Sequence, residues 1–253
     1  MIIYSVIFIL PAVFICNYVP KTDKSIGYKF ALPKKPLLVI LGTIGVISIV
    51  NTMTNILKVF VEMCGIHFYP ADITIPRDIT GIILFLIYST IIPAVVEELL
   101  FRKVILDSLL PYGTLFSIIA SSLLFSLMHC NPSQSLYTFA AGIVLAAVAV
   151  KTNSIIFPII IHFSNNLLSC VYMLLFEFAS EETYTAIVLS TDTVFKLFGV
   201  CFFIYLYRKK TLEYDNENKT NFDFPILKSS VRILFAAYIL YTAFLSMRWI
   251  YIK

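Results

Sequence analysis

Two glutamates and an arginine interrupt a long apolar stretch of this 253-residue chain, in the order Glu97-Glu98-Leu99-Leu100-Phe101-Arg102. An ionisable side chain in hydrocarbon costs about 2.5 kcal/mol or more, so such groups are rare there and mark functional sites. A carboxylate in a dry cavity is suited to general acid–base chemistry on a bound water. This cluster is therefore the first candidate for a functional site.

Helical spacing gives the two carboxylates different expected roles. Residues four positions apart lie on one face of a helix, so Glu98 faces Arg102 and an ion pair between them would neutralise two buried charges. At the same spacing Glu97 has only Pro93 and Phe101, so its partner must come from another helix. We expect Glu98 and Arg102 to support the site and Glu97 to do chemistry.

A candidate partner for Glu97 follows from counting residues. A break at residues 111–113, which include a proline and a glycine, predicts a helical hairpin. Glu97 lies sixteen residues before Gly113 and His129 sixteen residues after it. Both are then on the order of 20 Å from the turn, at similar depth. Phe125, one helical turn before His129, is expected to shield its imidazole from lipid.

A later apolar segment adds an imidazole and a carboxamide, since His162 and Asn166 are four residues apart. Polar groups from three helices would then converge in one cavity, which is how helical bundles build buried sites. Either histidine alone is typical of an interhelical hydrogen bond. The joint pattern with Glu97 favours a catalytic site. The third histidine, His67, lies near a helix end, where no catalytic role is expected.

The elements that carry these residues are predicted to be membrane-spanning helices. The chain is 59% hydrophobic, 15% aromatic and only 13% charged, which is outside the range of soluble domains. A helix needs about 20 residues to cross the hydrocarbon core. The sequence predicts an all-α, polytopic transmembrane bundle of about eight helices. The apolar stretches run over Ile2–Val19, Leu37–Leu57, Thr80–Leu110, Leu115–His129, Ser133–Val150, Ile155–Phe176, Thr191–Tyr207 and Val231–Ile252.

The polar stretches between these helices are too short to bury a second core. We therefore expect one intramembrane domain over residues 1–253, with its motif core at 93–166. The first apolar stretch has no basic leader and no small-residue cleavage pattern, so a retained helix is expected rather than a cleaved signal peptide. Five cysteines are widely spaced and form no CxxC pair, which argues against a disulfide framework or a thiolate zinc cluster.

Basic residues indicate the orientation in the membrane. Five lysines fill the loop at 21–35 and three basic residues follow the seventh predicted helix, so both loops are expected on the cytoplasmic side. The turn at 111–113 falls on that side as well. Both termini and an acidic loop with Glu181, Glu182 and Asp192 are expected outside. This topology accounts for the net charge of +4, so no nucleic-acid partner is needed.

Three motifs in order, Glu97-Glu98-x-x-x-Arg102, Phe125-x-x-x-His129 and His162-x-x-x-Asn166, resemble the CPBP intramembrane proteases. That family comprises the type II CAAX prenyl endopeptidases and bacterial relatives associated with bacteriocin processing and self-immunity. The resemblance covers Pro93 to Asn166, and the helices outside that core give it no specific support.

The resemblance implies an intramembrane endopeptidase that hydrolyses a peptide bond. Glu97 would be the general base, and His129 beside it would position and activate the water. His162 and Asn166 would donate hydrogen bonds to the developing oxyanion.

Several alternatives remain open at the level of sequence. Glu97, His129 and His162 together could form a zinc site with an open water position, although the family is usually described as metal-free, so no cofactor is expected. A proton-coupled transporter would also place Glu and His in membrane helices, but no inverted repeat is evident. A bis-histidine haem site would leave Glu97 and Asn166 without roles. A catalytically silent membrane immunity or scaffold protein is the last alternative.

The expected partners are the lipid bilayer and a peptide or protein substrate. The abundance of Ile, Lys, Asn, Phe and Tyr is typical of an AT-rich bacterium, which predicts a multi-pass protein of the bacterial plasma membrane. Prenylated CAAX proteins are not expected there, so a peptide precursor or a membrane-protein segment is the better substrate hypothesis. The side from which substrate enters and the oligomeric state are left open by the sequence.

Overall fold

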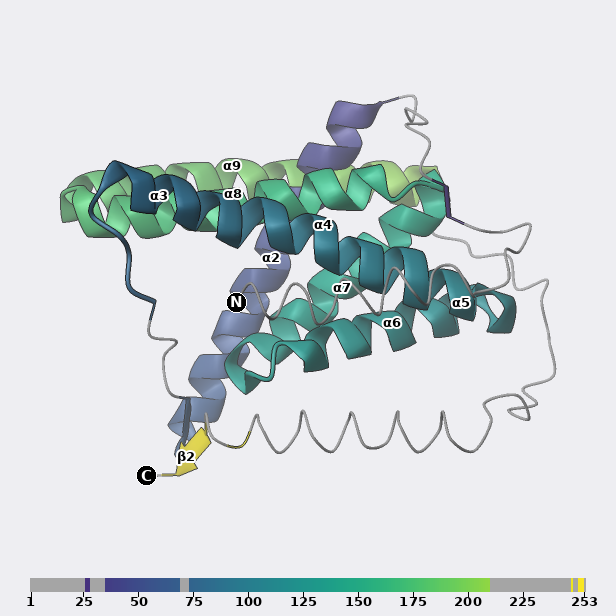
Figure 1. Cartoon of the computed structure of the whole chain (residues 1–253), viewed down its shortest axis with the longest axis horizontal. Helices are drawn as coiled ribbons and strands as arrows, with labels where there is room; N and C mark the ends of the chain where they lie inside the picture. The colour runs from purple at the N-terminus through teal and green to yellow at the C-terminus, as the bar shows by residue number, and fades with distance from the viewer. Residues whose placement is uncertain (1–25, 28–34, 69–72, 210–246, 248–249, 253) are drawn as a thin grey trace.

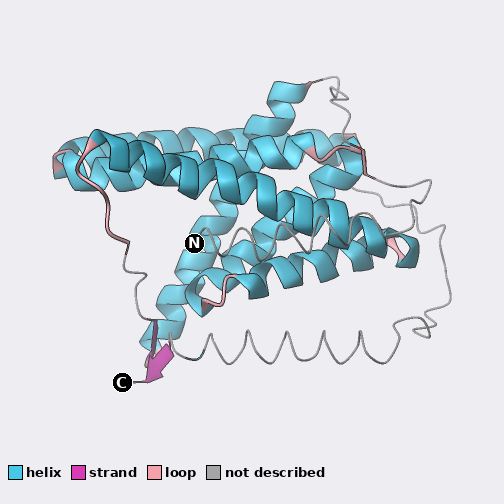
Figure 2. Ribbon diagram, viewed as in Figure 1, coloured by secondary structure: helices cyan, strands magenta, loops and turns pink. Residues whose placement is uncertain are grey.

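The computed structural model describes residues 26–27, 35–68, 73–209, 247 and 250–252, and these are almost entirely helical (Figure 2). One exception is a short antiparallel pair of strands, β1 (Ile66–Phe68) and β2 (Ile250–Ile252). The predicted all-α class is confirmed. His67 lies in β1, beyond the end of the preceding helix, as its expected place near a helix end implies.

Within the described residues, five helical segments are long and apolar enough to cross a membrane. They are α2 (Pro36–Met63), the run Ile79–Tyr112, α7 (Pro132–Thr152), α8 (Ile156–Phe178) and α9 (Glu181–Arg208). A sixth helix, α6 (Thr114–Met128), is apolar but has only 15 residues. At 1.5 Å per residue α6 is about 22 Å long, shorter than the ~30 Å hydrocarbon core. The chain is therefore a multi-pass membrane protein.

Only a small part of the two outermost apolar stretches lies within the described residues. Ile2–Val19 lies outside the described residues, and so does most of Val231–Ile252. The final residues of the latter form strand β2, so the prediction of a helix that continues to Ile252 is wrong. The total of about eight helices stays a prediction.

The run Ile79–Tyr112 is one continuous helical rod that changes its winding several times. Its segments are α3 (Ile79–Leu86), the π-helix η1 (Ile87–Ile91), α4 (Ile92–Glu98), the π-helix η2 (Leu99–Leu106), α5 (Asp107–Leu109) and the 3₁₀ turn η3 (Leu110–Tyr112). Pro93 at the start of α4 has no N–H to give to the preceding turn, which is a reason for the wider winding of η1. Gly113, at φ 119°, ends the rod where the sequence predicts the hairpin turn.

This rod connects two parts of the bundle (Figure 1). Its η1 and α4 segments pack against α8, whereas η2 packs against α6. The helix α7 packs against both α6 and α8. Side chains from α4, η2, α6 and α8 are therefore brought to one region of the protein, although α4 and α8 are far apart in sequence.

The helices α2 and α9 pack closely because two glycines meet where they cross. A Cβ atom on Gly45 would lie 2.1 Å from the carbonyl oxygen of Phe195, and one on Gly199 would lie 2.5 Å from the carbonyl carbon of Gly45. Such close backbone contact requires residues without side chains. This glycine pair joins α9 to α2, and α2 in turn packs against α7.

The expected acidic loop before the seventh predicted helix is not a loop. Helix α9 already begins at Glu181, capped by Ser180, whose side chain accepts a hydrogen bond from the backbone N–H of Thr183. Glu181 and Glu182 occupy the first turn, where negative charge stabilises a helix. Asp192 lies inside α9 and pairs with Lys196 one turn later, so its charge is neutralised within the helix.

Candidate active site

The acidic pair lies at the carboxyl end of α4, directly before the π-helical segment η2. Glu97 is 8% exposed, and both Glu98 and Arg102 are fully buried. Nε of Arg102 lies 3.0 Å from Oε2 of Glu98, which confirms the predicted ion pair. Within the described residues, Nη1 and Nη2 of Arg102 make no hydrogen bond. The guanidinium group therefore has donor capacity beyond its ion pair with Glu98.

His162 in α8 lies between the two glutamates. Its Nδ1–H donates a hydrogen bond of 2.9 Å to Oε1 of Glu98, and its Nε2 lies 3.8 Å from Oε2 of Glu97. A carboxylate can only accept, so the contact with Glu98 fixes the proton on Nδ1. Glu98 therefore contacts Arg102 with one oxygen and His162 with the other. The sequence predicts the first of these contacts but not the second.

Phe125 in α6 is the common apolar neighbour of these polar groups. Its ring centroid lies 5.0 Å from that of His129 and 5.9 Å from that of His162, both edge-on. The guanidinium carbon of Arg102 lies 4.9 Å from the same ring, in a cation–π contact. Phe125 itself is 3% exposed. The expected contact with His129 is present, and Phe125 also lines the rest of the site.

His129 lies one residue beyond the last residue of α6, as its C-cap. Its Nδ1–H donates to the backbone carbonyl of Phe125 at 2.9 Å, which leaves Nε2 as the nitrogen able to accept from a water. The chain turns sharply after it, because Cys130 has φ +48° and Asn131 caps α7 by accepting from the N–H of Ser133. This turn holds the imidazole at the end of the short helix.

His129 and His162 both act electrostatically on Glu97, as do Glu98 and Arg102. That His129 and Glu97 lie at the same depth stays a prediction. The described contact of Glu97 with a histidine, however, is made by His162. Glu97 thus faces one imidazole held by Glu98 and is within electrostatic range of a second.

Asn166 is one turn beyond His162 on α8 and is partly buried. No hydrogen bond to its carboxamide is found among the described residues. Its neighbour Asn165 is engaged instead, since Nδ2 of Asn165 lies 3.0 Å from the hydroxyl oxygen of Tyr137, which in turn lies 3.2 Å from Oδ1. Tyr137 and Asn165 join α7 to α8 and were not singled out by the sequence. Their polar groups at membrane depth are the signal that points to them.

Two of the donors of the zinc alternative, His129 and His162, each already contact a protein oxygen through Nδ1. In the part of the chain that the structure describes, no three His, Cys, Asp or Glu side chains are grouped to hold a metal ion. The Nδ1 atom of His162 already contacts Glu98.

Comparison with known proteins assigns the region that contains this site. Residues 79–168 match the family model described as type II CAAX prenyl endopeptidase Rce1-like. The matched residues include the motif core predicted from sequence, and they span the rod, α6, α7 and the part of α8 that carries His162. No curated protein and no solved structure matches the chain. Residues 79–168, which contain the buried acidic pair and His162, therefore form a domain of the type II CAAX prenyl endopeptidase (CPBP) family.

Proposed function

We propose that the protein is an intramembrane endopeptidase in which Glu97 activates a water molecule for attack on a peptide bond. The observation that carries this proposal is the position of His162 between two carboxylates, 2.9 Å from Glu98 and 3.8 Å from Glu97. A structural ion pair needs only Glu98 and Arg102. The second carboxylate and the imidazole facing it are arranged for proton transfer.

The charges of the cluster support a defined starting state. Two carboxylates, Glu97 and Glu98, are balanced by the guanidinium of Arg102 and by His162 when it is an imidazolium. In that state both nitrogens of His162 are donors, one directed at each glutamate. A neutral cluster minimises the cost of keeping four ionisable groups in a dry site.

Hydrolysis then proceeds with one transfer of negative charge. Glu97 takes a proton from the water as the water oxygen bonds to the carbonyl carbon, and the charge leaves Glu97 for the new oxyanion. The Nε2–H of His162, which at first faces Glu97, then donates a hydrogen bond to the oxyanion. Glu97 next gives its proton to the amide nitrogen as the C–N bond breaks. The first products are a carboxylic acid and an amine, and transfer of the remaining carboxyl proton to the amine leaves a carboxylate and an ammonium.

Two further residues complete the proposal. His129 holds its Nδ1–H on the carbonyl of Phe125, so its Nε2 accepts from the attacking water and orients it. Asn166, one turn from His162, supplies a second donor to the oxyanion. Glu98 and Arg102 hold His162 in place and complete the charge balance.

The substrate class that we propose is a peptide precursor or a segment of a membrane protein, processed in maturation or self-immunity. Burial of the site favours a chain that enters in an extended form from within or beside the bilayer. The whole chain would serve this activity as one intramembrane domain.

Hydrolysis by purified protein in detergent tests this function. Internally quenched peptides should be cleaved, and in H₂¹⁸O one ¹⁸O atom should enter the new carboxyl terminus. Glu177→Gln is a matched control, because it makes the same chemical change at the exposed ion pair with Arg77. Absence of cleavage by protein that is folded and monodisperse would favour a silent scaffold, and proton-coupled solute uptake in proteoliposomes would favour a transporter.

A further inference from the structure

Two residues that precede α2, Ile26 and Gly27, lie against the rod that carries the acidic pair; we call them the strap. The N–H of Ile26 donates a 2.7 Å hydrogen bond to Oδ1 of Asp107, and its carbonyl accepts from Nζ of Lys103. Lys103 and Asp107 are themselves paired at 2.9 Å. One ion pair therefore contacts both backbone polar groups of a single residue.

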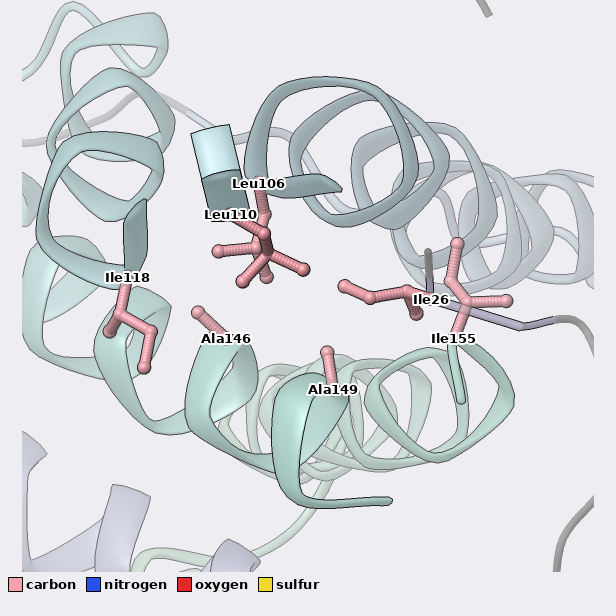
Figure 3. Close-up of a cluster of buried hydrophobic side chains, with 7 residues drawn as sticks. All are labelled: Ile26, Leu106, Leu110, Ile118, Ala146, Ala149 and Ile155. Atoms are coloured by element: carbon pink, nitrogen blue, oxygen red, sulfur yellow. The ribbon is translucent and has the colours of Figure 1, made fainter. Parts of the chain in front are cut away.

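The other side of the strap is attached to the linker between α7 and α8. Gly27 forms a parallel bridge with Ser154. The N–H of Gly27 donates a 3.3 Å hydrogen bond to the carbonyl of Asn153, and the carbonyl of Gly27 accepts a 3.1 Å hydrogen bond from the N–H of Ile155. The side chain of Ile26 is 1% exposed and fills the space between the end of the rod and this linker (Figure 3). The strap thus joins the two helical segments that supply the acidic pair and His162.

The predicted topology agrees with this junction. The loop at 21–35 and the turn at 111–113 are both expected on one side of the membrane. Ile26, from that loop, lies in a buried cluster with Leu110, directly before the turn, and with Ile155 from the linker between α7 and α8. The strap therefore lies at one end of the bundle, two to three helical turns from the glutamates.

The segment to which the strap binds has an unusual winding. The π-helix η2 extends over eight residues, Leu99–Leu106, whereas π-helices are mostly single turns and are often found at functional sites. A π turn contains one residue more than an α turn, so a return to α-helical winding would rotate the following residues by about 100°. Lys103 and Asp107 would then turn away from Ile26. Binding of the strap is therefore specific for the π-helical register.

We propose that the strap is a positioning device that holds η2 in this register and thereby sets the contacts of Glu98. Arg102 is in η2 next to Lys103, so a change in winding that turned Lys103 away from the strap would also move Arg102 relative to Glu98. The strap at the same time fixes the start of α8, which carries His162. Asp107, Lys103 and Ile26 are thus positioning residues for the catalytic geometry, and this role rests on the proposed function.

Ring ¹⁵N resonances of histidine test the proposal without relying on activity. The chain has 3 histidines, so the imidazole spectrum of the full-length protein in detergent is simple, and His162→Gln assigns one set of signals. Asp107→Ala should shift the His162 signals and lower kcat by on the order of 10- to 100-fold, with KM unchanged. Asp107→Asn keeps an acceptor for the Ile26 N–H and should restore much of both.

Asp192→Ala is the matched control, because Asp192 also pairs with a lysine four residues later but lies in α9. It should leave the His162 signals unchanged. Unshifted signals in folded Asp107→Ala would overturn the proposal. Should that variant not fold, Lys103→Gln, which removes the charged donor to the Ile26 carbonyl, provides the comparison, and the absence of any shift in it would overturn the proposal. A shift in protein whose wild type cleaves no peptide would support the strap and refute the peptidase mechanism.

Discussion

Replacement of Glu98 by glutamine tests the double role of this carboxylate. The substitution removes the charge that pairs with Arg102 at 3.0 Å, while a carbonyl oxygen remains to accept from Nδ1 of His162. Arg102 is fully buried, so its guanidinium would be left as an unpaired charge. Breaking a buried pair in this way costs about 3–5 kcal/mol. We expect a loss at the lower end of this range, about 3 kcal/mol.

The free energy of unfolding can be measured by titration with denaturing detergent in mixed micelles. A loss of about 3 kcal/mol corresponds to a change of more than 100-fold in the unfolding equilibrium. The double variant Glu98→Gln/Arg102→Met strands no charge, so it should be more stable than Glu98→Gln alone by about 2 kcal/mol. Glu177→Gln, at an exposed ion pair, should show no measurable change.

Two results would show that Glu98 does not have this double role. If the double variant is no more stable than Glu98→Gln, the buried charge of Arg102 is not what the substitution exposes. If Glu98→Gln is fully stable and yet inactive, Glu98 itself is the chemical residue and the assignment of Glu97 as base is wrong.

Three further substitutions or measurements address the remaining roles. Asn166→Ala should lower kcat by ~10²- to 10³-fold with little change in KM, and a change confined to KM would assign it to substrate binding instead. Tyr137→Phe removes the hydroxyl that is hydrogen-bonded to Asn165, so it should lower the free energy of unfolding by about 1 kcal/mol and leave kcat within a fewfold of the wild-type value. Detergent unfolding and steady-state kinetics would measure these two effects. Zinc measured by mass spectrometry should stay at background in purified protein. Stoichiometric zinc that disappears in His129 or His162 variants would establish the metal-dependent alternative.

Local spacing accounts for the part of the site that could be predicted. The ion pair between Glu98 and Arg102 depends on positions four apart in one helix, and the contact of Phe125 with His129 depends on the same rule. Such contacts require no knowledge of which helices are neighbours. The sequence likewise predicts that Glu97 needs a partner from another helix.

The identity of that partner depends on helix packing, and the sequence predicts a different histidine from the one that the structure places there. The hairpin count favours His129, because it compares depth along two consecutive helices. In the structure α4 packs against α8, so His162 is the imidazole in contact with both glutamates. Depth alone does not specify which neighbouring helix a side chain faces.

The sequence also does not predict how a helix is wound or which residues far apart in the chain are in contact. The eight-residue π-helix η2 has no distinctive composition, since its apolar residues would suit an α-helix equally well. The strap joins Ile26 to Asp107, 81 positions apart, through backbone groups that every residue possesses. The four-residue spacing of Lys103 and Asp107 is typical of an ion pair within a helix, but it does not indicate that Asp107 contacts Ile26. Similarly, the polar residues at the start of α9 are typical of a loop in the sequence, although in the structure they stabilise a helix terminus.

The most direct test of the mechanism is the turnover of Glu97→Gln, measured with an internally quenched peptide that the wild-type protein cleaves. Glutamine preserves the shape of the side chain and cannot accept a proton from water as a base. Hydrolysis should fall by at least ~100-fold while detergent unfolding stays close to that of wild type. Turnover near the wild-type rate in this variant would show that Glu97 is not the general base and remove it from the mechanism.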